Sequence, residues 1–417
     1  MNKLLFVAII LLPILSCSKD DVTKDKNGIV ISMKANWVTS ITDDDSLSNN
    51  FMFKHSISND NSVVIRARKQ QQNILKCLNT DDGTVKWDWN EFSINPLGIS
   101  YPHKYNNNLI WQEDYYNYCV DLSTGKTVWK NTSVENYEYR SLGVNNMFTV
   151  GHLANRNKPT EKGGNIVVMD SKTGKPIFSF KPKYDATGDV PSNECGWGYW
   201  GFPIPFSRDG KEYILIKFND APIACKTSYV EWLGLYNYTD KTWVYERQRL
   251  KSNDNAFTTP TPSVIVGDKV YNNPTNSITC HDLMTGNKLW ETQTNGSTGS
   301  RILVENGYVY LNSGSGNMMA IDANSGTIKW SVASPGGLTT PTYLNGFIYF
   351  IGASDGKLNA IDAVTGEYIW KIESPDKSKN KWATFLGPCT VVPGVGLVKS
   401  KIIVTTGLNA YCYEAIK

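Results

Sequence analysis

The chain has 417 residues, of which 41% are hydrophobic, 12% aromatic and 19% charged. This composition excludes a disordered or low-complexity chain and is sufficient to bury a large core. Lysine and arginine (42) nearly balance aspartate and glutamate (39), and the basic residues are scattered along the chain. The charge therefore argues against a nucleic-acid-binding surface.

The N-terminus has the pattern of an export signal. Residues 1–16 combine Lys3 with a long apolar run that ends at the small residue Ser16, which is typical of a secretory signal peptide and too short to span a bilayer. The four residues that end at Cys17 resemble the lipobox of bacterial lipoproteins, in which the cysteine is acylated and becomes the mature N-terminus. We therefore expect fatty acids such as palmitate on Cys17, with an ordinary signal peptide and a chance cysteine as the alternative.

The residues after Cys17 predict a location. Ser18, Lys19, Asp20 and Asp21 are similar to a signal that sends lipoproteins of some Gram-negative bacteria to the outer face of the outer membrane. We expect residues 17–28 to form an acylated tether that holds the protein on the outer membrane at the cell surface. A plain solvated tether at the periplasmic face is the alternative.

One string recurs along the rest of the chain. It places Asp, or Asn in one copy, four residues before a Gly, and an aromatic residue four residues after that Gly. An Asp can accept hydrogen bonds from turn amides and Gly adopts positive φ, so each string predicts a turn between two strands. The six full copies are NTDDGTVKW (79–87), DLSTGKTVW (121–129), DSKTGKPIF (170–178), DLMTGNKLW (282–290), DANSGTIKW (322–330) and DAVTGEYIW (362–370), and NYTDKTW (237–243) is a seventh copy without its Gly.

The repeats predict a β-propeller. Each repeat contains four short strand-like runs, and the string joins the last two of them. The aromatic residues recur about 40 to 65 residues apart, which is typical of four-stranded propeller blades. We expect the repeated aromatic residues to pack one blade against the next. They are Trp87, Trp129, Phe178, Trp243, Trp290, Trp330 and Trp370.

The two ends of the chain predict how the ring closes. Strands are expected at 401–406 and at 408–414, where LNAYCYE matches LNAIDAV (358–364), and the chain then stops before an outer strand. Residues 33–40 carry Trp37 with no preceding blade. We predict that the strand with Trp37 completes the last blade, so that residues 29–417 form an all-β, eight-bladed propeller of four-stranded blades without an open edge.

The D-x-x-T-G-x-x-x-W string resembles the repeat of the pyrroloquinoline-quinone (PQQ) propeller superfamily. That superfamily contains quinoprotein dehydrogenases and also a non-enzymatic lipoprotein branch, which includes the B subunit of the outer-membrane β-barrel assembly machine. The dehydrogenases hold the quinone against an adjacent Cys-Cys pair beside a calcium site and a catalytic Asp, and no two cysteines are adjacent here. The resemblance therefore implies a propeller that is not an enzyme and binds no cofactor.

The cysteines and histidines offer no catalytic pattern. Cys77, Cys119 and Cys280 occupy the repeat position held elsewhere by Ala320 and Ala360, which predicts buried packing residues. Cys195 with Cys225, and Cys389 with Cys412, share blades and permit one or two disulfides after export, although connectivity does not follow from sequence. The four histidines lack metal-ligand spacing, so no metal site is expected.

An aromatic segment, NECGWGYWGFPIPF (193–206), departs from the repeat. Its Trp197, Tyr199, Trp200 and Phe202 are candidate ligand-binding residues that could stack on a sugar or anchor a protein partner, or could instead pack back onto their own blade. The sequence favours a non-enzymatic outer-membrane lipoprotein that acts as a protein-binding scaffold. A surface glycan-binding lipoprotein that uses this segment is the alternative, and a degenerate quinoprotein dehydrogenase is the second.

Overall fold

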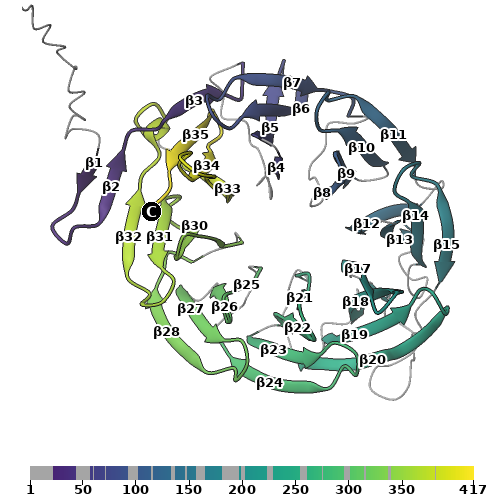
Figure 1. Cartoon of the computed structure of the whole chain (residues 1–417). Coiled ribbons are helices and arrows are strands. Elements are labelled where there is room, and N and C mark those ends of the chain that lie inside the picture. The colour runs from purple at the N-terminus through teal and green to yellow at the C-terminus, as the bar shows by residue number, and fades with distance from the viewer. Residues whose placement is uncertain are drawn as a thin grey trace, which may run out of the picture.

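The chain folds into eight β-sheets that stand around a central axis, as the computed structural model in Figure 1 shows. Besides one 3-10 turn, η2 (Pro375–Ser378), the regular elements of the described residues are strands. The predicted all-β, eight-bladed propeller is confirmed. The described residues are 22–43, 57–59, 61–70, 72–92, 102–113, 116–132, 137–145, 148–155, 165–180, 197–198, 202–222, 229–253, 261–274, 276–294, 301–313, 316–336, 340–380 and 382–417.

Each blade is an antiparallel meander whose first strand lies nearest the axis and whose fourth strand lies on the outside (Figure 1). Blade 1 is β4 (Ile57–Asn59), β5 (Ser62–Lys69), β6 (Gln72–Asn79) and β7 (Val85–Trp89). Blade 2 is β8 (His103–Tyr105), β9 (Asn108–Glu113), β10 (Tyr116–Asp121) and β11 (Thr127–Thr132). Blade 3 is β12 (Tyr137–Val144), β13 (Phe148–Asn155), β14 (Asn165–Asp170) and β15 (Pro176–Phe180). Blade 4 is β17 (Phe202–Arg208), β18 (Lys211–Pro222), β19 (Tyr229–Asn237) and β20 (Thr242–Asn253), with the short β16 (Trp197–Gly198) paired to the end of β18.

Blades 5 to 7 repeat the pattern with shorter strands. Blade 5 is β21 (Val264–Val266), β22 (Lys269–Asn272), β23 (Ser277–Asp282) and β24 (Lys288–Gln293). Blade 6 is β25 (Leu303–Glu305), β26 (Tyr308–Asn312), β27 (Asn317–Asp322) and β28 (Ile328–Ala333). Blade 7 is β29 (Thr342–Leu344), β30 (Phe347–Ile351), β31 (Leu358–Asp362) and β32 (Tyr368–Ile372). Blade 8 takes β33 (Leu386–Val392), β34 (Lys401–Thr405) and β35 (Asn409–Glu414) from the C-terminus and β3 (Trp37–Ser40) from the N-terminus.

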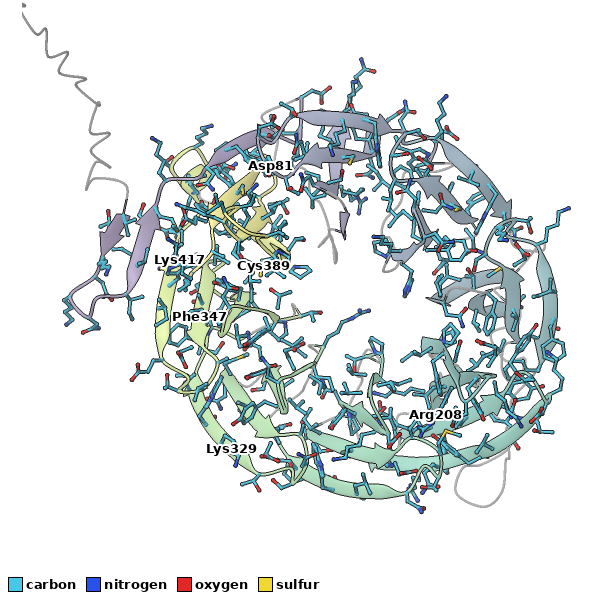
Figure 2. All side chains as sticks on the ribbon, viewed as in Figure 1. Asp81, Arg208, Lys329, Phe347, Cys389 and Lys417 are labelled. Atoms are coloured by element: carbon cyan, nitrogen blue, oxygen red, sulfur yellow. The ribbon has the colours of Figure 1, made fainter. Side chains whose placement is uncertain are left out.

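The predicted closing strand is confirmed. β3 pairs antiparallel with β35, so that Trp37 lies opposite Cys412. Lys401 of blade 8 then reaches blade 1, where its Nζ donates to the carbonyl of Thr80 at 3.1 Å and forms an ion pair with Asp81. Figure 2 labels Asp81 at this junction, so strands from both ends of the chain tie the ring shut.

The predicted match between residues 408–414 and 358–364 is wrong by two positions. Cys412 pairs with Trp37 as Ala360 pairs with Trp370, so Cys412 is the counterpart of Ala360. A shift of two residues leaves every side chain on the same face of the strand, which is why the residue pattern alone did not reveal the correct register.

Residues 22–28 of the expected tether, residues 17–28, belong to the folded chain. Val22–Lys24 forms β1, which pairs with β2 (Val30–Met33), and β2 lies parallel to β32 on the outside of blade 7 (Figure 1). The N-terminal residues from Val22 onward therefore extend a blade of the propeller. Residues 1–21, including Cys17, lie outside the described part of the chain.

The repeated string forms the predicted turn. In blade 2 the Asp121 carboxylate accepts hydrogen bonds from the backbone amides of Ser123 and Thr124 at 3.0 and 2.8 Å, and from both hydroxyls. These hydrogen bonds hold the pKa of Asp121 below its usual range. Gly125 has φ +68°, a conformation that other residues adopt only with strain.

The aromatic residue of one blade packs on the turn of the next. The Trp87 Nε1–H donates to the Leu122 carbonyl at 2.9 Å, and its ring lies against Gly125. We call this arrangement, an indole that donates to the carbonyl after the Asp and covers the Gly, the Trp–Gly clasp. It recurs for Trp37 on Gly83, Trp129 on Gly174, Trp290 on Gly326 and Trp330 on Gly366.

Blade 4 departs from the clasp on both sides. Phe178 of blade 3 has no N–H to donate, and it stacks with Phe180 and Tyr236 beside a turn that has lost its Gly. The expected role of Trp243 in packing blade 4 on blade 5 is wrong, because Trp243 faces Phe180 of blade 3. Tyr245 takes that role: its hydroxyl donates to the Leu283 carbonyl at 3.0 Å and its ring lies against Gly286.

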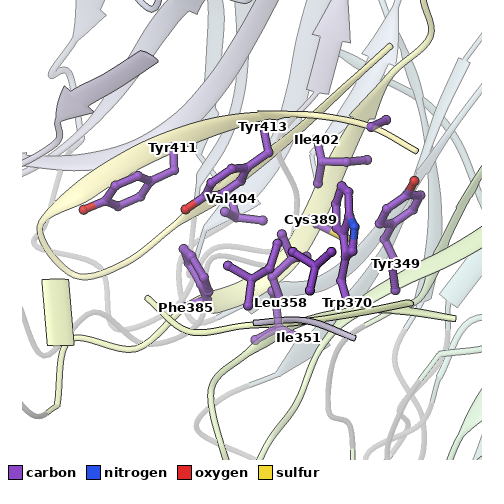
Figure 3. Packing of buried hydrophobic residues seen from close by; sticks show 14 of the residues in the cluster. Tyr349, Ile351, Leu358, Trp370, Phe385, Cys389, Ile402, Val404, Tyr411 and Tyr413 are labelled. Carbon is purple, nitrogen blue, oxygen red and sulfur yellow. The ribbon is translucent and has the colours of Figure 1, made fainter. Parts of the chain in front are cut away.

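The core lies between the blades. Between blades 7 and 8, Trp370, Tyr349, Phe385 and Tyr411 form one of several buried clusters, with Cys389 among them (Figure 3). The five described cysteines are free and buried: Cys77, Cys119, Cys280, Cys389 and Cys412.

The possible disulfide between Cys389 and Cys412 does not form. The two residues lie on β33 and β35 with β34 between them, and they belong to clusters on opposite sides of the blade. Two strand spacings are about 10 Å, whereas a disulfide needs Cα atoms within about 7 Å. Cys195 and Cys225 lie outside the described residues.

Candidate functional site

The two flat faces of the ring carry different connections. Successive connections of an antiparallel meander alternate between the two ends of its strands. One face, here called the turn face, therefore carries the hairpins between strands one and two and the Asp-Gly turns between strands three and four. The opposite face, the loop face, carries the connections between strands two and three and those from blade to blade.

Of the aromatic segment predicted as a ligand site, the structure describes residues 197–198 and 202–206. Residues 202–206 belong to β17, and Trp197 and Gly198 pair with Pro222 and Ala221 at the loop-face end of β18. Tyr199 and Trp200, and the side chains of Trp197 and Phe202, lie outside the described residues. Whether these aromatic side chains form a site therefore stays a prediction.

An exposed apolar hairpin stands on the turn face of blade 8. It connects β33 to β34, and we call residues 393–400 the apolar tip. Leu397 is fully exposed and Val395 is 80% exposed, with Val398 exposed beside them. Exposed apolar side chains that stand together, unlike single scattered ones, mark interaction sites.

The apolar tip is held in one conformation. The Val398 amide donates to the Val395 carbonyl at 3.1 Å, and the Gly394 amide donates to the Ser400 hydroxyl at 2.9 Å. A Cβ on Gly394 would lie 2.1 Å from the Val398 carbonyl oxygen, so the close crossing of the chain requires glycine there. The Ser400 carbonyl in turn accepts from Ala415 at 2.9 Å, which fixes the tip to β35.

Sequence reasoning missed the apolar tip. The run PGVGLV (393–398) carries two glycines and a proline, which predict a turn, but apolar residues in a propeller sequence are normally assigned to buried strands. The available signal was the spacing of Gly394 and Gly396, which places Val395 and Leu397 within the turn itself.

Blade 4 contributes a buried ion pair at its boundary with blade 5. The Lys217 Nζ lies 3.6 Å from Glu231 Oε1 and 3.5 Å from the Asn273 carbonyl, and both charged side chains are almost fully buried. Glu231 Oε2 has no hydrogen-bond partner among the described residues. The pair replaces the apolar packing that Leu215 and Leu235 provide toward the turn face.

Burial shifts the pKa values of two histidines and two cysteines among the described residues. Burial, with the positive charge of Arg301, lowers the pKa of His103 to about 4, and burial also lowers the pKa of His281. Both imidazoles are neutral near pH 7. Burial raises the pKa of Cys389 to about 11 and that of Cys412 to about 12, so neither thiol is an activated nucleophile.

The described residues do not fit the quinone and calcium that the superfamily implies. Within the described ranges, no group of three or more His, Cys, Asp or Glu side chains could hold a metal ion. The described cysteines also lie apart, each buried in the packing of its own blade. No helix of the described residues is long and apolar enough to cross a membrane.

The fold and the repeat together define an eight-bladed β-propeller of PQQ-like repeats. A family model described as "Outer membrane protein assembly factor BamB" matches residues 274–393, and the chain resembles that family there. No curated protein sequence matched the chain.

Three solved structures are similar to the chain. BamB from Moraxella catarrhalis is 17% identical, with 80% of this chain and 93% of that chain covered and a TM-score of 0.49. The quinohemoprotein alcohol dehydrogenase from Comamonas testosteroni is 12% identical, with 91% and 76% covered and a TM-score of 0.59. The computationally designed Ika8 protein is 10% identical, with 92% and 99% covered and a TM-score of 0.54. At these identities the likeness to the dehydrogenase and to Ika8 concerns the fold alone.

Proposed function

We propose that this chain is a non-enzymatic lipoprotein of the outer membrane that acts as a scaffold and binds another protein through its turn face. The observation that carries the proposal is the apolar tip, where Leu397 and Val395 are held in water by backbone hydrogen bonds. A rigid apolar surface binds a partner without a large loss of conformational entropy. Burying two such side chains contributes about 3 to 6 kcal/mol.

The proposed location is supported by the sequence. Residues 1–16 have the pattern of an export signal and Cys17 stands where a lipoprotein carries its acyl chains. The match of residues 274–393 to the family of an outer membrane assembly factor agrees with that location. Two or three acyl chains would anchor the protein stably, since one chain alone gives only marginal binding.

The test is affinity purification of the anchored full-length protein from outer membranes in mild detergent, with partners quantified by mass spectrometry. We expect a protein at near-equimolar amounts with the wild type, and at least a tenfold loss for the double variant Val395→Ser, Leu397→Ser. The matched control is Val266→Ser, which replaces an exposed valine of the corresponding hairpin in blade 5.

Three results would contradict the proposal. Equal recovery of the partner with the tip variant would exclude the apolar tip as the binding surface. A protein that is recovered alone would favour the glycan-binding alternative, and a carbohydrate screen with Trp197→Ala and Trp200→Ala would follow. A quinone absorption band after incubation with PQQ and calcium would favour the dehydrogenase alternative.

A further inference from the structure

A tryptophan is held in water on the loop face, between blades 7 and 8. Trp382 is 71% exposed, although Ala383 and Phe385, which follow it, are completely buried. Complete burial of a tryptophan removes about 200 Å² from water, so an indole that is largely exposed is a candidate contact for another phase or molecule.

Local hydrogen bonds fix the backbone from which this indole projects. The Asn380 side chain accepts from the Trp382 amide at 3.0 Å, and the Trp382 carbonyl accepts from Thr384 at 2.9 Å. The Phe385 amide then donates to the Gly356 carbonyl of blade 7 at 3.0 Å. The backbone on either side of Trp382 is thereby fixed to the blade.

The turn η2, just before Trp382, is anchored in blade 8. The buried Asp376 carboxylate accepts from the Thr406 hydroxyl at 2.6 Å and from the Asn409 amide at 2.8 Å. Lys379 follows the same turn; its Nζ lies 3.9 Å from Asp376 Oδ1, and its side chain is 71% exposed. The segment therefore presents an exposed indole and an exposed ammonium group from a rigid base.

The described chain begins on the same side of the molecule. β2 runs parallel to β32, and the Glu373 amide at the end of β32 lies 3.4 Å from the Ile31 carbonyl oxygen. Val22 pairs with Met33, so Val22 lies at the loop-face end of the hairpin. Residues 17–21 extend at most about 17 Å, which keeps Cys17 near this part of the ring.

We propose that the loop face around Trp382 docks on the phospholipid bilayer that the acyl chains of Cys17 enter. This inference rests on the proposed lipoprotein. An indole suits the boundary between headgroups and acyl chains, and Lys379 can extend its ammonium group into the headgroup layer while its stem stays near the apolar region. The short link to Cys17 keeps Trp382 close to the bilayer. The turn face, with its apolar tip, then points away from the membrane toward a partner.

The test uses the full-length acylated protein in vesicles of phosphatidylethanolamine and phosphatidylglycerol, with or without bromine on the acyl chains. Bromine quenches only indoles that reach the bilayer. The fluorescence of Trp382 is obtained as the emission of the wild type minus that of Trp382→Ser. We expect brominated vesicles to reduce this fluorescence at least twofold. The matched control is Leu397→Trp, which adds an indole on the turn face. The additional emission of this variant should be the same in vesicles with and without bromine.

Each outcome decides a separate point. An unchanged Trp382 emission in the acylated protein, or quenching of the Leu397→Trp indole, would overturn the docking of the loop face and leave the lipoprotein in place. Mass spectrometry of the N-terminal peptide measures acylation of Cys17 directly, and an unmodified cysteine would overturn both proposals. Both variants change exposed side chains, so unchanged melting temperatures verify folding.

Discussion

The indole of Trp87 and the glycine at position 125 form a directional contact between two blades. The Trp87 Nε1–H donates to the Leu122 carbonyl at 2.9 Å, and a Cβ on Gly125 would lie 2.6 Å from the ring. The strand of one blade therefore supplies the aromatic residue and the turn of the next supplies the space. Because the same clasp recurs at five boundaries, the repeat string encodes the packing of blades as well as the turn.

The clasp predicts that Gly125→Ala destabilises the protein through lost packing in addition to backbone strain. Gly210 has a similar φ, +73° against +68°, but a Cβ there would meet nothing within 4 Å. We expect Gly210→Ala to cost about 1 kcal/mol from strain and Gly125→Ala to cost about 2 to 4 kcal/mol, because the Trp87 ring must move. Urea unfolding of both variants measures the difference, and equal costs would show that the clasp contributes no packing.

The closing strand predicts a large effect of a short truncation. A chain that begins at residue 34 lacks β1 and β2, whereas one that begins at residue 41 also lacks β3. The second truncation removes Trp37, its hydrogen bond to Thr80, and the pairing with β35. We expect it to lower the melting temperature by at least about 5 °C relative to the first. Equal melting temperatures would mean that β3 does not close the ring.

The buried pair of Lys217 and Glu231 predicts non-additive changes. Lys217→Met leaves the Glu231 carboxylate buried without its partner, and we expect a loss of about 3 to 5 kcal/mol. The double variant Lys217→Met, Glu231→Leu removes both charges and should recover most of that loss. Lys211→Met breaks the exposed pair with Asp240 and serves as the control, with little expected change. Additive single changes in a double-mutant cycle would contradict a coupled pair.

The repeat made the fold predictable from sequence. The prediction failed in blade 4, where the repeat itself is altered. The string predicted the turns of six blades and the clasp residues Trp87, Trp129, Trp290 and Trp330. Trp37 located the closing strand. In blade 4 Lys241, with φ +57°, stands where the other turns have Gly, and the aromatic residue four positions after it is Tyr245, not the more conspicuous Trp243. The sequence also did not reveal the two-residue shift of Cys412, because such a shift leaves each side chain on the same face of the strand.

The candidate surfaces were less predictable than the fold. β2 joins blade 7 through a parallel pairing near Trp370, and a strand of four residues carries too little pattern to reveal it. Val395, Leu397 and Trp382 are apolar residues whose exposure depends on the backbone hydrogen bonds of their turns. Sequence composition indicates that such residues are apolar, but only the folded chain shows that they face water.

Acid is expected to weaken the boundary between blades 4 and 5 through His281. The Nδ1 of this buried imidazole lies 3.0 Å from the Gly286 carbonyl, so Nδ1 carries the proton of the neutral ring and Nε2 has no partner among the described residues. Burial lowers the pKa of His281 below its usual value. The unfolded chain therefore takes up this proton near pH 6.5, before the folded chain does.

The stability contributed by neutral His281 is thus complete above about pH 6.5 and is lost as the pH falls toward the lower pKa of the folded state. His281→Asn keeps a donor for the Gly286 carbonyl and removes the titrating group. We expect the free-energy difference between wild type and variant to shrink between pH 7 and pH 5, by at most about 1.4 kcal/mol per pH unit. Urea unfolding at four pH values measures it. A constant difference would show that His281 has the same pKa in both states.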